Sequence, residues 1–149
     1  MSEKTVARNR KAKFEFFILD TMEAGISLVG SEIKSIRASQ VSLEEAYIKV
    51  DGQEAWLMDA HIAPYELANR FNHEPRRSRR LLLHKKEILK LWSEVRQKGV
   101  TIIPVRMYLK DGRAKVEIAV AKGKKLYDKR ADIAKKDMQR DMDRKLKDY

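Results

Sequence analysis

The sequence predicts a mainly β fold, an OB-fold-like antiparallel β-barrel with two to three flanking helices and a basic C-terminal tail. Three observations predict it. The chain has 149 residues, of which 43% are hydrophobic, enough for one core of ordinary size. Five or six short strand-like runs share the chain with two helical runs, and no repeat or long linker divides them. In residues 122–149, eleven basic and six acidic residues leave few large apolar ones for a core.

The first predicted elements lie around a short helix. Residues 1–13 form a polar, basic N-terminal segment that is expected to be flexible at its start. Residues 14–19 (FEFFIL) are rich in the aromatic and β-branched residues typical of a strand, and residues 26–29 (ISLV) lie between two glycines as a second, shorter strand. Residues 31–38 have isoleucines at helical spacing, so they predict a helix with Ser31 as its N-cap.

A hairpin and an irregular segment follow. Residues 46–50 and 54–58 are expected to be paired strands, because Asp51-Gly52 between them is a strong signal for a tight turn. Residues 60–75 contain two prolines, which interrupt regular structure. We therefore expect this segment to form no helix or strand.

The clearest helix of the chain comes next. Ile88, Leu91, Trp92 and Val95 recur at the spacing that gives a helix one apolar face. Gly99 follows at the place where a glycine commonly ends a helix. The preceding basic run is expected to form the cationic start of this helix.

Two strands complete the predicted barrel, which spans residues 14–121. Residues 100–109 predict a strand in which Pro104 indicates an edge or a bulge. Residues 113–121 alternate between apolar and charged side chains, the pattern of a half-buried strand.

Positive charge is concentrated in three parts of the chain. The formal net charge is +11, made up of +4 in residues 1–13, −7 in 14–75, +6 in 76–90, +3 in 91–121 and +5 in 122–149. Residues 76–90 (RRSRRLLLHKKEILK) alone hold seven basic residues and one acid. This distribution indicates a polyanionic partner, with nucleic acid favoured over an anionic membrane and over a merely solvated basic surface.

Several functional classes lack the residues that they need. The chain has no cysteine, which excludes disulfides and thiolate metal sites. It has no apolar run of about 18 residues and no signal-peptide core, so we expect a cytoplasmic protein without a membrane partner. Phosphate-binding and nucleophile motifs are absent, and the three histidines lie in separate segments. We expect no metal and no cofactor.

Two alternatives remain open at this point. Glu23, Glu32, Glu44, Glu45 and Asp59 could meet to bind Mg²⁺ in a metal-dependent nuclease. A general OB-type single-strand nucleic-acid binder would instead expose several aromatic side chains on one sheet face for stacking on bases. The aromatic residues available for it are Phe14, Phe16, Phe17, Tyr47, Trp56 and Tyr108.

Five motifs, in order along the chain, resemble those of one family. They are NRKA (9–12), MEAGI (22–26), GSEIKSIR (30–37), RRLLLHK (79–85) and KGKKLYDKR (122–130). Together they resemble the SmpB family, the SsrA-binding proteins of bacteria, from about residue 9 to residue 130. One departure is Ser39, which stands where the family usually has glycine.

The resemblance implies a function in translation. It implies a non-enzymatic protein that binds the tRNA-like domain of transfer-messenger RNA (tmRNA, or SsrA RNA) and delivers it to stalled ribosomes for trans-translation. The protein would stand in for the missing anticodon arm. Its tail would enter the 16S rRNA decoding centre and the empty mRNA channel, and would become helical there after being disordered in the free protein. The complex is expected to contain one copy of the chain.

The resemblance also implies a set of RNA-binding residues on the barrel. Polar and apolar groups would read the folded RNA, while basic groups would contact phosphates and set the register. Glu32 is expected to pair with a basic neighbour, Lys34 or Arg37. The predicted RNA-binding residues are Asn9, Lys11, Glu23, Lys34, Arg37, Arg76, Arg79, Arg80, Leu82 and His84.

The tail residues take their roles from the same resemblance. Gly123, Lys124 and Lys125 match a hinge and first ribosomal contact, and Tyr127 lies where a ring could stack on a ribosomal base. The motif needed for tagging on the ribosome corresponds to Asp128, Lys129 and Arg130. Contacts with RNA phosphates are expected from a helix after Ala131, through Lys135, Lys136 and Arg140.

Overall fold

A computed structural model describes residues 3–67 and 72–124 of the chain. The predicted tail helix lies outside the described residues, as do Lys125, Tyr127, Asp128, Lys129, Arg130, Lys135, Lys136 and Arg140. The elements are β1 (Glu3–Arg8), α1 (Ala12–Glu15), β2 (Phe16–Ile26), α2 (Gly30–Arg37), β3 (Val41–Ser42), β4 (Tyr47–Val50), β5 (Ala55–Met58), β6 (His61–Ile62), β7 (Arg79–Leu82), α3 (Lys85–Lys98), β8 (Thr101–Lys110) and β9 (Arg113–Gly123).

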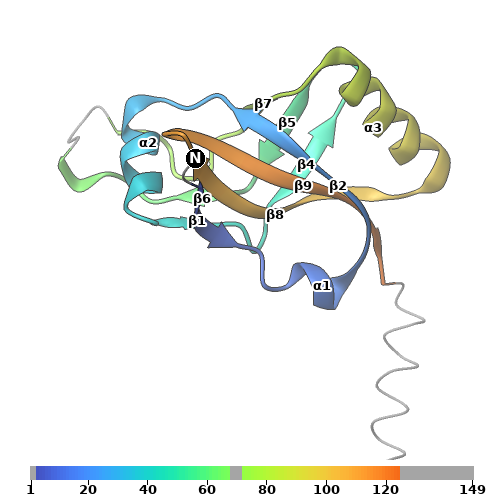
Figure 1. Ribbon diagram of the computed structural model, residues 1–149, viewed down its shortest axis with the longest axis horizontal. Coiled ribbons are helices and arrows are strands. Elements are labelled where there is room, and N and C mark those ends of the chain that lie inside the picture. The colour runs from blue at the N-terminus through green and yellow to red at the C-terminus, as the bar shows by residue number, and fades with distance from the viewer. Residues whose placement is uncertain (1–2, 68–71, 125–149) are drawn as a thin grey trace, which may run out of the picture.

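Six antiparallel strands close into a ring (Figure 1). β8 pairs with β4, β4 with β5, β5 with β7, β7 with β2, and β2 with β9, which returns to β8. β1 also pairs with β8, whereas β3 and β6 form a separate two-stranded ladder. The prediction of a mainly β, OB-fold-like barrel is confirmed.

Two joints of the ring are short. β4 meets β8 at one residue pair, Ile48 with Ile102, and α3 contacts both strands. β7 meets β2 at two residue pairs, formed by Leu81 and Leu82. The long ladders between β2, β9 and β8 therefore make up most of the barrel wall.

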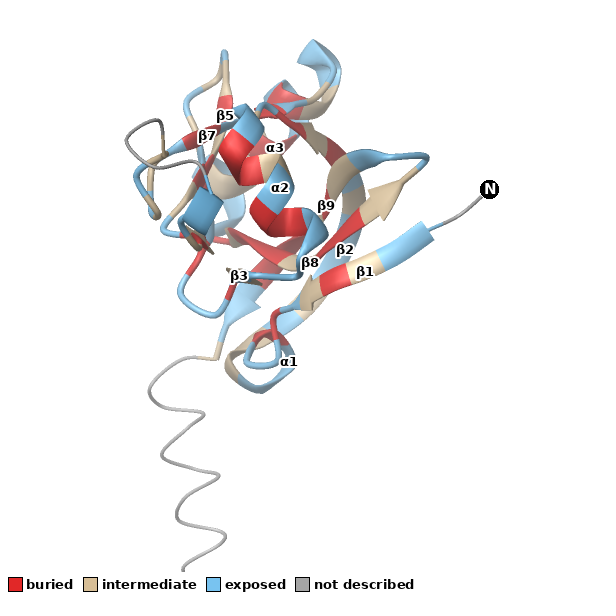
Figure 2. Ribbon diagram, turned by 90° about the vertical axis from the view of Figure 1, so that its left-hand side faces the viewer, coloured by how far each residue is buried: buried red, intermediate tan, exposed pale blue. Residues whose placement is uncertain are grey.

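The core fills the ring and extends to its ends. α2 and α3 lie at opposite ends of the barrel (Figure 1), and buried residues lie along the strands and on the face of α2 that packs against them (Figure 2). A second, smaller cluster lies between α1 and the ends of β2, β8 and β9. Fully buried members of the main core include Ile36, Leu43, Leu57, Ile62, Leu91, Met107, Val116 and Ile118.

One predicted turn and one predicted bulge are confirmed, and one loop has an unusual backbone. Gly52, with a φ of +87°, lies in the β4–β5 turn, and a Cβ added to it would lie 3.3 Å from the Trp92 ring of α3. The register of β8 against β9 shifts between Pro104 and Arg106, which is the predicted bulge. Ser39 has a φ of 59°, a left-handed conformation in which glycine is least strained.

The N-terminal predictions were wrong in two respects. Residues 3–8 form β1, which is held by its ladder with β8, and Arg106 Nη1 of β8 lies 2.7 Å from the Glu3 carboxylate. The expectation of flexibility at the start of the segment therefore fails from Glu3 on. The strand predicted at 14–19 begins instead at Phe16, after the short helix α1, and continues to Ile26.

Three further elements differ from prediction. ISLV is no strand, because only Ile26 belongs to β2. Helix α2 begins at Gly30 with Val29 rather than Ser31 at the N-cap, and the Val29 backbone N–H donates to the Glu32 carboxylate at 2.9 Å. The irregular segment contains β6, and part of the basic run is strand β7 rather than the start of a helix.

The predicted boundary between barrel and tail also moves. β9 continues to Gly123, which pairs with Phe16, and the Lys124 backbone N–H donates to the Glu15 carbonyl at 3.0 Å. Lys122 and Gly123 are thus part of the barrel wall.

Candidate nucleic-acid interface

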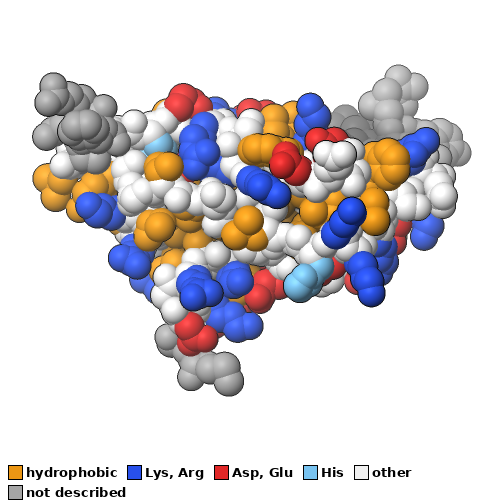
Figure 3. Space-filling model, turned by 90° about the horizontal axis from the view of Figure 1, so that it is seen from above, with side chains coloured by type: hydrophobic (Ala, Val, Ile, Leu, Met, Phe, Trp, Pro, Cys, Tyr) orange, Lys and Arg blue, Asp and Glu red, His pale blue; other side chains and the backbone are white. Residues whose placement is uncertain are grey.

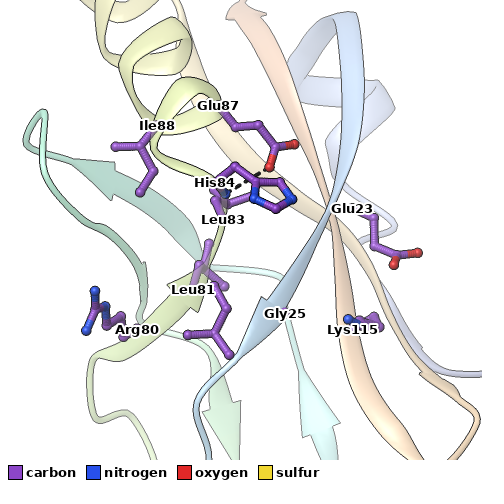
Figure 4. Close-up of a pocket in the computed structure, with 10 residues that line it drawn as sticks. Glu23, Gly25, Arg80, Leu81, Leu83, His84, Glu87, Ile88 and Lys115 are labelled. Carbon is purple, nitrogen blue, oxygen red and sulfur yellow. Dashed lines mark hydrogen bonds between the residues drawn. The ribbon is translucent and has the colours of Figure 1, made fainter.

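A hollow of about 450 Å³ lies between β2, β7 and the start of α3 (Figure 4). Four of the predicted RNA-binding residues line it together: Glu23 from β2, Arg80 and Leu82 from β7, and His84 before α3. In Figure 4, His84 faces the strand that carries Glu23, and Arg80 and Lys115 lie on opposite sides of the leucines. Residues about sixty positions apart in sequence therefore meet at one site.

The apolar part of the hollow depends on a glycine. Leu82 is 55% exposed, so its side chain faces solvent rather than the core. A Cβ added to Gly25 would lie 3.1 Å from the Leu82 Cβ, closer than such contacts normally come. Glycine at this position lets β2 and β7 approach while the leucine side chain projects into solvent. An exposed leucine beside charged groups can pack against the face of an unstacked base.

His84 occupies the N-cap of α3. Its backbone N–H donates to the Glu87 carboxylate at 2.9 Å, and it is followed by the first turn of the helix. The cap fixes the backbone at His84 while its exposed ring remains available to an external partner. Imidazole can donate and accept hydrogen bonds and can stack on a base.

Glu23 is held in one orientation by a buried tyrosine. The Tyr108 hydroxyl donates to Glu23 Oε2, and Lys110 Nζ lies 3.6 Å from the same oxygen. The hydrogen bond from Tyr108, aided by the charges of Lys110 and Lys115, holds the pKa of Glu23 below its usual value of 4.5. Burial raises the pKa of Tyr108, and its bond to Glu23 raises it further, so the hydroxyl stays a donor. The carboxylate is therefore ionised at neutral pH and can accept a hydrogen bond from an amino group or a 2′-OH.

Sequence reasoning missed Tyr108, Lys110 and Lys115 as members of this site. The sequence offers Tyr108 as a stacking aromatic, yet the structure leaves it only 2% exposed. On a strand that alternates apolar and charged residues, a lysine such as Lys115 indicates only that its side chain faces solvent. It does not indicate which residue lies beside it. Nothing in the spacing indicates that β8 and β9 bring these three residues to Glu23.

Asn9 and Lys11 lie apart from this hollow. They line a second one, of about 280 Å³, beside α1 and β4. Asn9 is buried, and its side-chain amide donates to the Pro104 carbonyl at 3.0 Å while its backbone N–H donates to Val105 at 2.8 Å. Asn9 therefore ties the chain before α1 to the β8 bulge, whereas Lys11 is exposed.

A buried ion cluster fixes the start of α2 against β7. Glu32 is fully buried, and its carboxylate accepts hydrogen bonds from Arg77 Nη2 at 2.6 Å and from Arg79 Nε. Burial alone would raise the pKa of Glu32, but these bonds outweigh it and hold the pKa below 4.5. The expectation that Glu32 pairs with Lys34 or Arg37 is wrong. Its true partners lie 45 and 47 positions away.

Arg79 cannot contact RNA. Its side chain is 0% exposed, and besides Glu32 it donates to the carbonyls of Ala60 at 2.8 Å and Pro75 at 2.9 Å. The prediction of Arg79 as a phosphate contact is therefore wrong, because its guanidinium is buried and ion-paired with Glu32. The nuclease alternative also loses an acid, since both oxygens of Glu32 are held by arginines.

The other predicted cations lie at the surface. Arg80 extends beside Glu54 at 3.7 Å, and Arg76 pairs with Glu45 at 3.1 Å. Lys34 and Arg37 are exposed on α2, where the Lys34 amine lies 5.4 Å from the Tyr65 ring. Figure 3 shows lysines and arginines spread among exposed hydrophobic side chains rather than merged into one patch. Such a surface suits a partner with both phosphates and exposed bases.

The sequence pattern of the SmpB protein family matches residues 6–148 of this chain. The chain belongs to the SmpB family. An SsrA-binding protein of Desulforudis audaxviator is 56% identical over 142 residues, covering 95% of this chain and 93% of its own length. An SsrA-binding protein of Enterococcus hirae is 51% identical over 146 residues, covering 98% and 95% respectively. The family predicted from the five motifs is confirmed.

A solved structure supports the fold of this SmpB-family chain. It is described as "tmRNA-SmpB: a journey to the center of the bacterial ribosome" and is 44% identical in sequence. The two structures superpose with a TM-score of 0.66, over 80% of this chain and 84% of the other. Among the described residues, no helix is long and apolar enough to cross a membrane.

Proposed function

We propose that this chain binds tmRNA and delivers it to stalled ribosomes for trans-translation. The observation that carries the proposal is the hollow between β2, β7 and α3, in which Glu23, Arg80, Leu82 and His84 meet in a member of the SmpB family. Its relatives are named for SsrA binding, and its structural neighbour is a tmRNA-SmpB complex with the ribosome.

Each group in the hollow has a chemical task in RNA binding. Leu82 packs against an unstacked base, His84 stacks or donates a hydrogen bond, and Glu23 accepts from an amino group or a 2′-OH. Arg80 and Lys115 contact the flanking phosphates, which supply affinity and register. Lys11, Lys34, Arg37 and Arg76 extend the phosphate contacts over the surrounding surface, whereas Asn9 keeps the backbone before Lys11 in place.

The rest of the mechanism follows from the tail. Residues 125–149 enter the 16S rRNA decoding centre and mRNA channel, and the barrel takes the place of an anticodon arm. The chain acts as an RNA-binding factor and not as an enzyme, as one copy in each complex, without metal or cofactor. Its place of action is the cytoplasm, because ribosomes and tmRNA are there.

A competition experiment tests the proposal. The full chain is titrated against the tRNA-like domain of tmRNA at about 0.15 M salt, with bulk tRNA as competitor. We expect tight binding that survives an excess of tRNA. Equal competition by tRNA would mean that the charge of +11 acts without recognition. A variant with Leu82→Ser and His84→Ala should lose the preference for tmRNA and keep the weaker binding shared with tRNA.

We predict that Tyr108 acts on RNA through Glu23. Tyr108→Phe removes the hydroxyl that orients the carboxylate. The affinity for tmRNA should then fall about fivefold, which corresponds to the net contribution of one hydrogen bond. In a Glu23→Ala background the same change should have no further effect, because the group that it orients is gone. Tyr65→Phe is the matched control and should leave affinity unchanged. Additive losses in the double variant would contradict the prediction.

A further inference from the structure

Two phenylalanines lie exposed where the barrel ends. Phe14 on α1 is 71% exposed and Phe17 at the start of β2 is 48% exposed, with Leu19 nearby at 56%. Their neighbours Phe16 and Ile18 point the other way and pack on the small cluster around α1. A group of large apolar side chains left in water marks an interaction surface more often than chance exposure does.

One lysine brings the two rings together. Lys124, the residue after β9, has its amine 5.3 Å from the Phe17 ring centroid and 5.9 Å from that of Phe14. A backbone hydrogen bond from Lys124 to Glu15 keeps this arrangement in place, so it does not depend on a mobile side chain alone. The three residues come from α1, β2 and the end of β9, which lie side by side in Figure 1.

The surrounding charge favours a polyanion. Lys122 is paired with Phe17 across the β2–β9 ladder, so the two side chains lie on the same face of the sheet, and Lys122 is exposed. Lys13 is exposed on α1. Flat rings beside ammonium groups are the combination that binds single-stranded nucleic acid, with the base on the ring and the phosphate on the cation.

We propose that Phe14, Phe17 and Lys124 form a stacking site for an unpaired base of ribosomal RNA. The inference rests on the proposed function, and it adds a binding site on the barrel itself. Phe17 lies six residues from Glu23 along β2, about 20 Å at the rise of a strand, so the site is separate from the hollow that binds tmRNA. Lys124 is also the residue from which the ribosome-binding tail departs. The surface beside it must therefore face the partner that the tail enters.

Ring-removing and ring-keeping variants test the site. The double variant Phe14→Leu, Phe17→Leu keeps apolar side chains and loses the flat rings, whereas Phe14→Tyr, Phe17→Tyr keeps the rings. We expect the leucine variant, bound to tmRNA, to lose about tenfold in affinity for stalled ribosomes, a typical effect of losing one stacked base. The tyrosine variant should stay within about twofold of wild type. Leu89→Ala, which trims an exposed apolar side chain on α3, is the control and should change nothing.

The outcomes separate this inference from the proposed function. Wild-type binding to tmRNA is measured in the same series, and its absence would overturn the proposed function itself. If tmRNA binds the leucine variant normally and the ribosome binds it weakly, the site is supported. A matching loss of tmRNA affinity would assign the base to tmRNA and overturn the proposal. Unchanged ribosome affinity, or an equal loss in the tyrosine variant, would overturn it as well.

A photocrosslink gives a second, independent readout. Benzoylphenylalanine in place of Phe14 or Phe17 should crosslink to ribosomal RNA in the complex with a stalled ribosome. Crosslinks to tmRNA alone, or to ribosomal protein alone, would contradict the proposal.

Discussion

Replacing Arg79 by leucine is expected to lower the free energy of unfolding by about 3–5 kcal/mol, the usual cost of removing one partner of a buried ion pair. The change leaves Glu32 charged in the core with Arg77 as its remaining side-chain partner. It also takes the Arg79 donor from the Ala60 carbonyl, and it leaves the Pro75 carbonyl with the Ile62 N–H alone. Urea unfolding at pH 7 measures the effect. The matched control is Arg76→Leu, an exposed arginine paired with Glu45, which should cost less than about 1 kcal/mol.

Two further measurements make this result specific. The double variant Glu32→Met, Arg79→Leu removes both fully buried charges and should recover much of the lost stability. Arg77, which also loses Glu32, is 33% exposed and can be solvated. The wild type should also lose stability in acid. Since the folded pKa of Glu32 lies below 4.5, its contribution is complete above pH 4.5 and disappears as the pH falls through the folded value. An Arg79→Leu variant as stable as wild type would contradict the structural role assigned to the cluster.

Ending the chain after Lys124 should abolish tagging on stalled ribosomes and leave tmRNA binding within about threefold of wild type. Residues 125–149 hold nine basic and six acidic residues, so their removal takes away only three net charges from the +11 of the whole chain. The hollow and the cations around it remain. Cutting before Lys122, where the sequence alone placed the boundary, would instead remove the end of β9.

The truncation is read with two assays. Binding to the tRNA-like domain reports on the barrel, and peptide tagging in a reconstituted stalled translation reaction reports on the tail. A chain whose residues 125–149 are shuffled keeps composition and charge, and it should fail in tagging as the truncation does. If the truncated chain loses most of its tmRNA affinity, barrel and tail do not have the separate tasks proposed for them.

The sequence predicted those elements whose signal is local. The β4–β5 hairpin follows from Asp51-Gly52, the bulge from Pro104, and α3 from its apolar spacing together with Gly99. Each depends on a few neighbouring residues, so no knowledge of the fold was needed.

The basic run after Pro75 shows where local reasoning fails. Four arginines in five positions indicate a solvated segment, yet Arg79–Leu82 is a barrel strand with Arg79 and Leu81 pointing inward. Arg79 can be buried because the Glu32 carboxylate, in the first turn of α2, pairs with its guanidinium. Its partner lies 47 positions away, and nothing near either residue indicates the pairing. The same limit applies to Tyr108, whose role depends on Glu23 being brought to it by β9.

The short joint between β2 and β7 affects how the barrel moves. Two residue pairs hold this joint, whereas nine hold β2 against β9. Local opening is expected to start there, so amide hydrogens at Gly25 and Leu82 should exchange with solvent sooner than those along β8 and β9. The hollow lies over the same joint. Bound RNA would hold β2 and β7 together, and it would thereby stabilise the folded state of the protein that carries it.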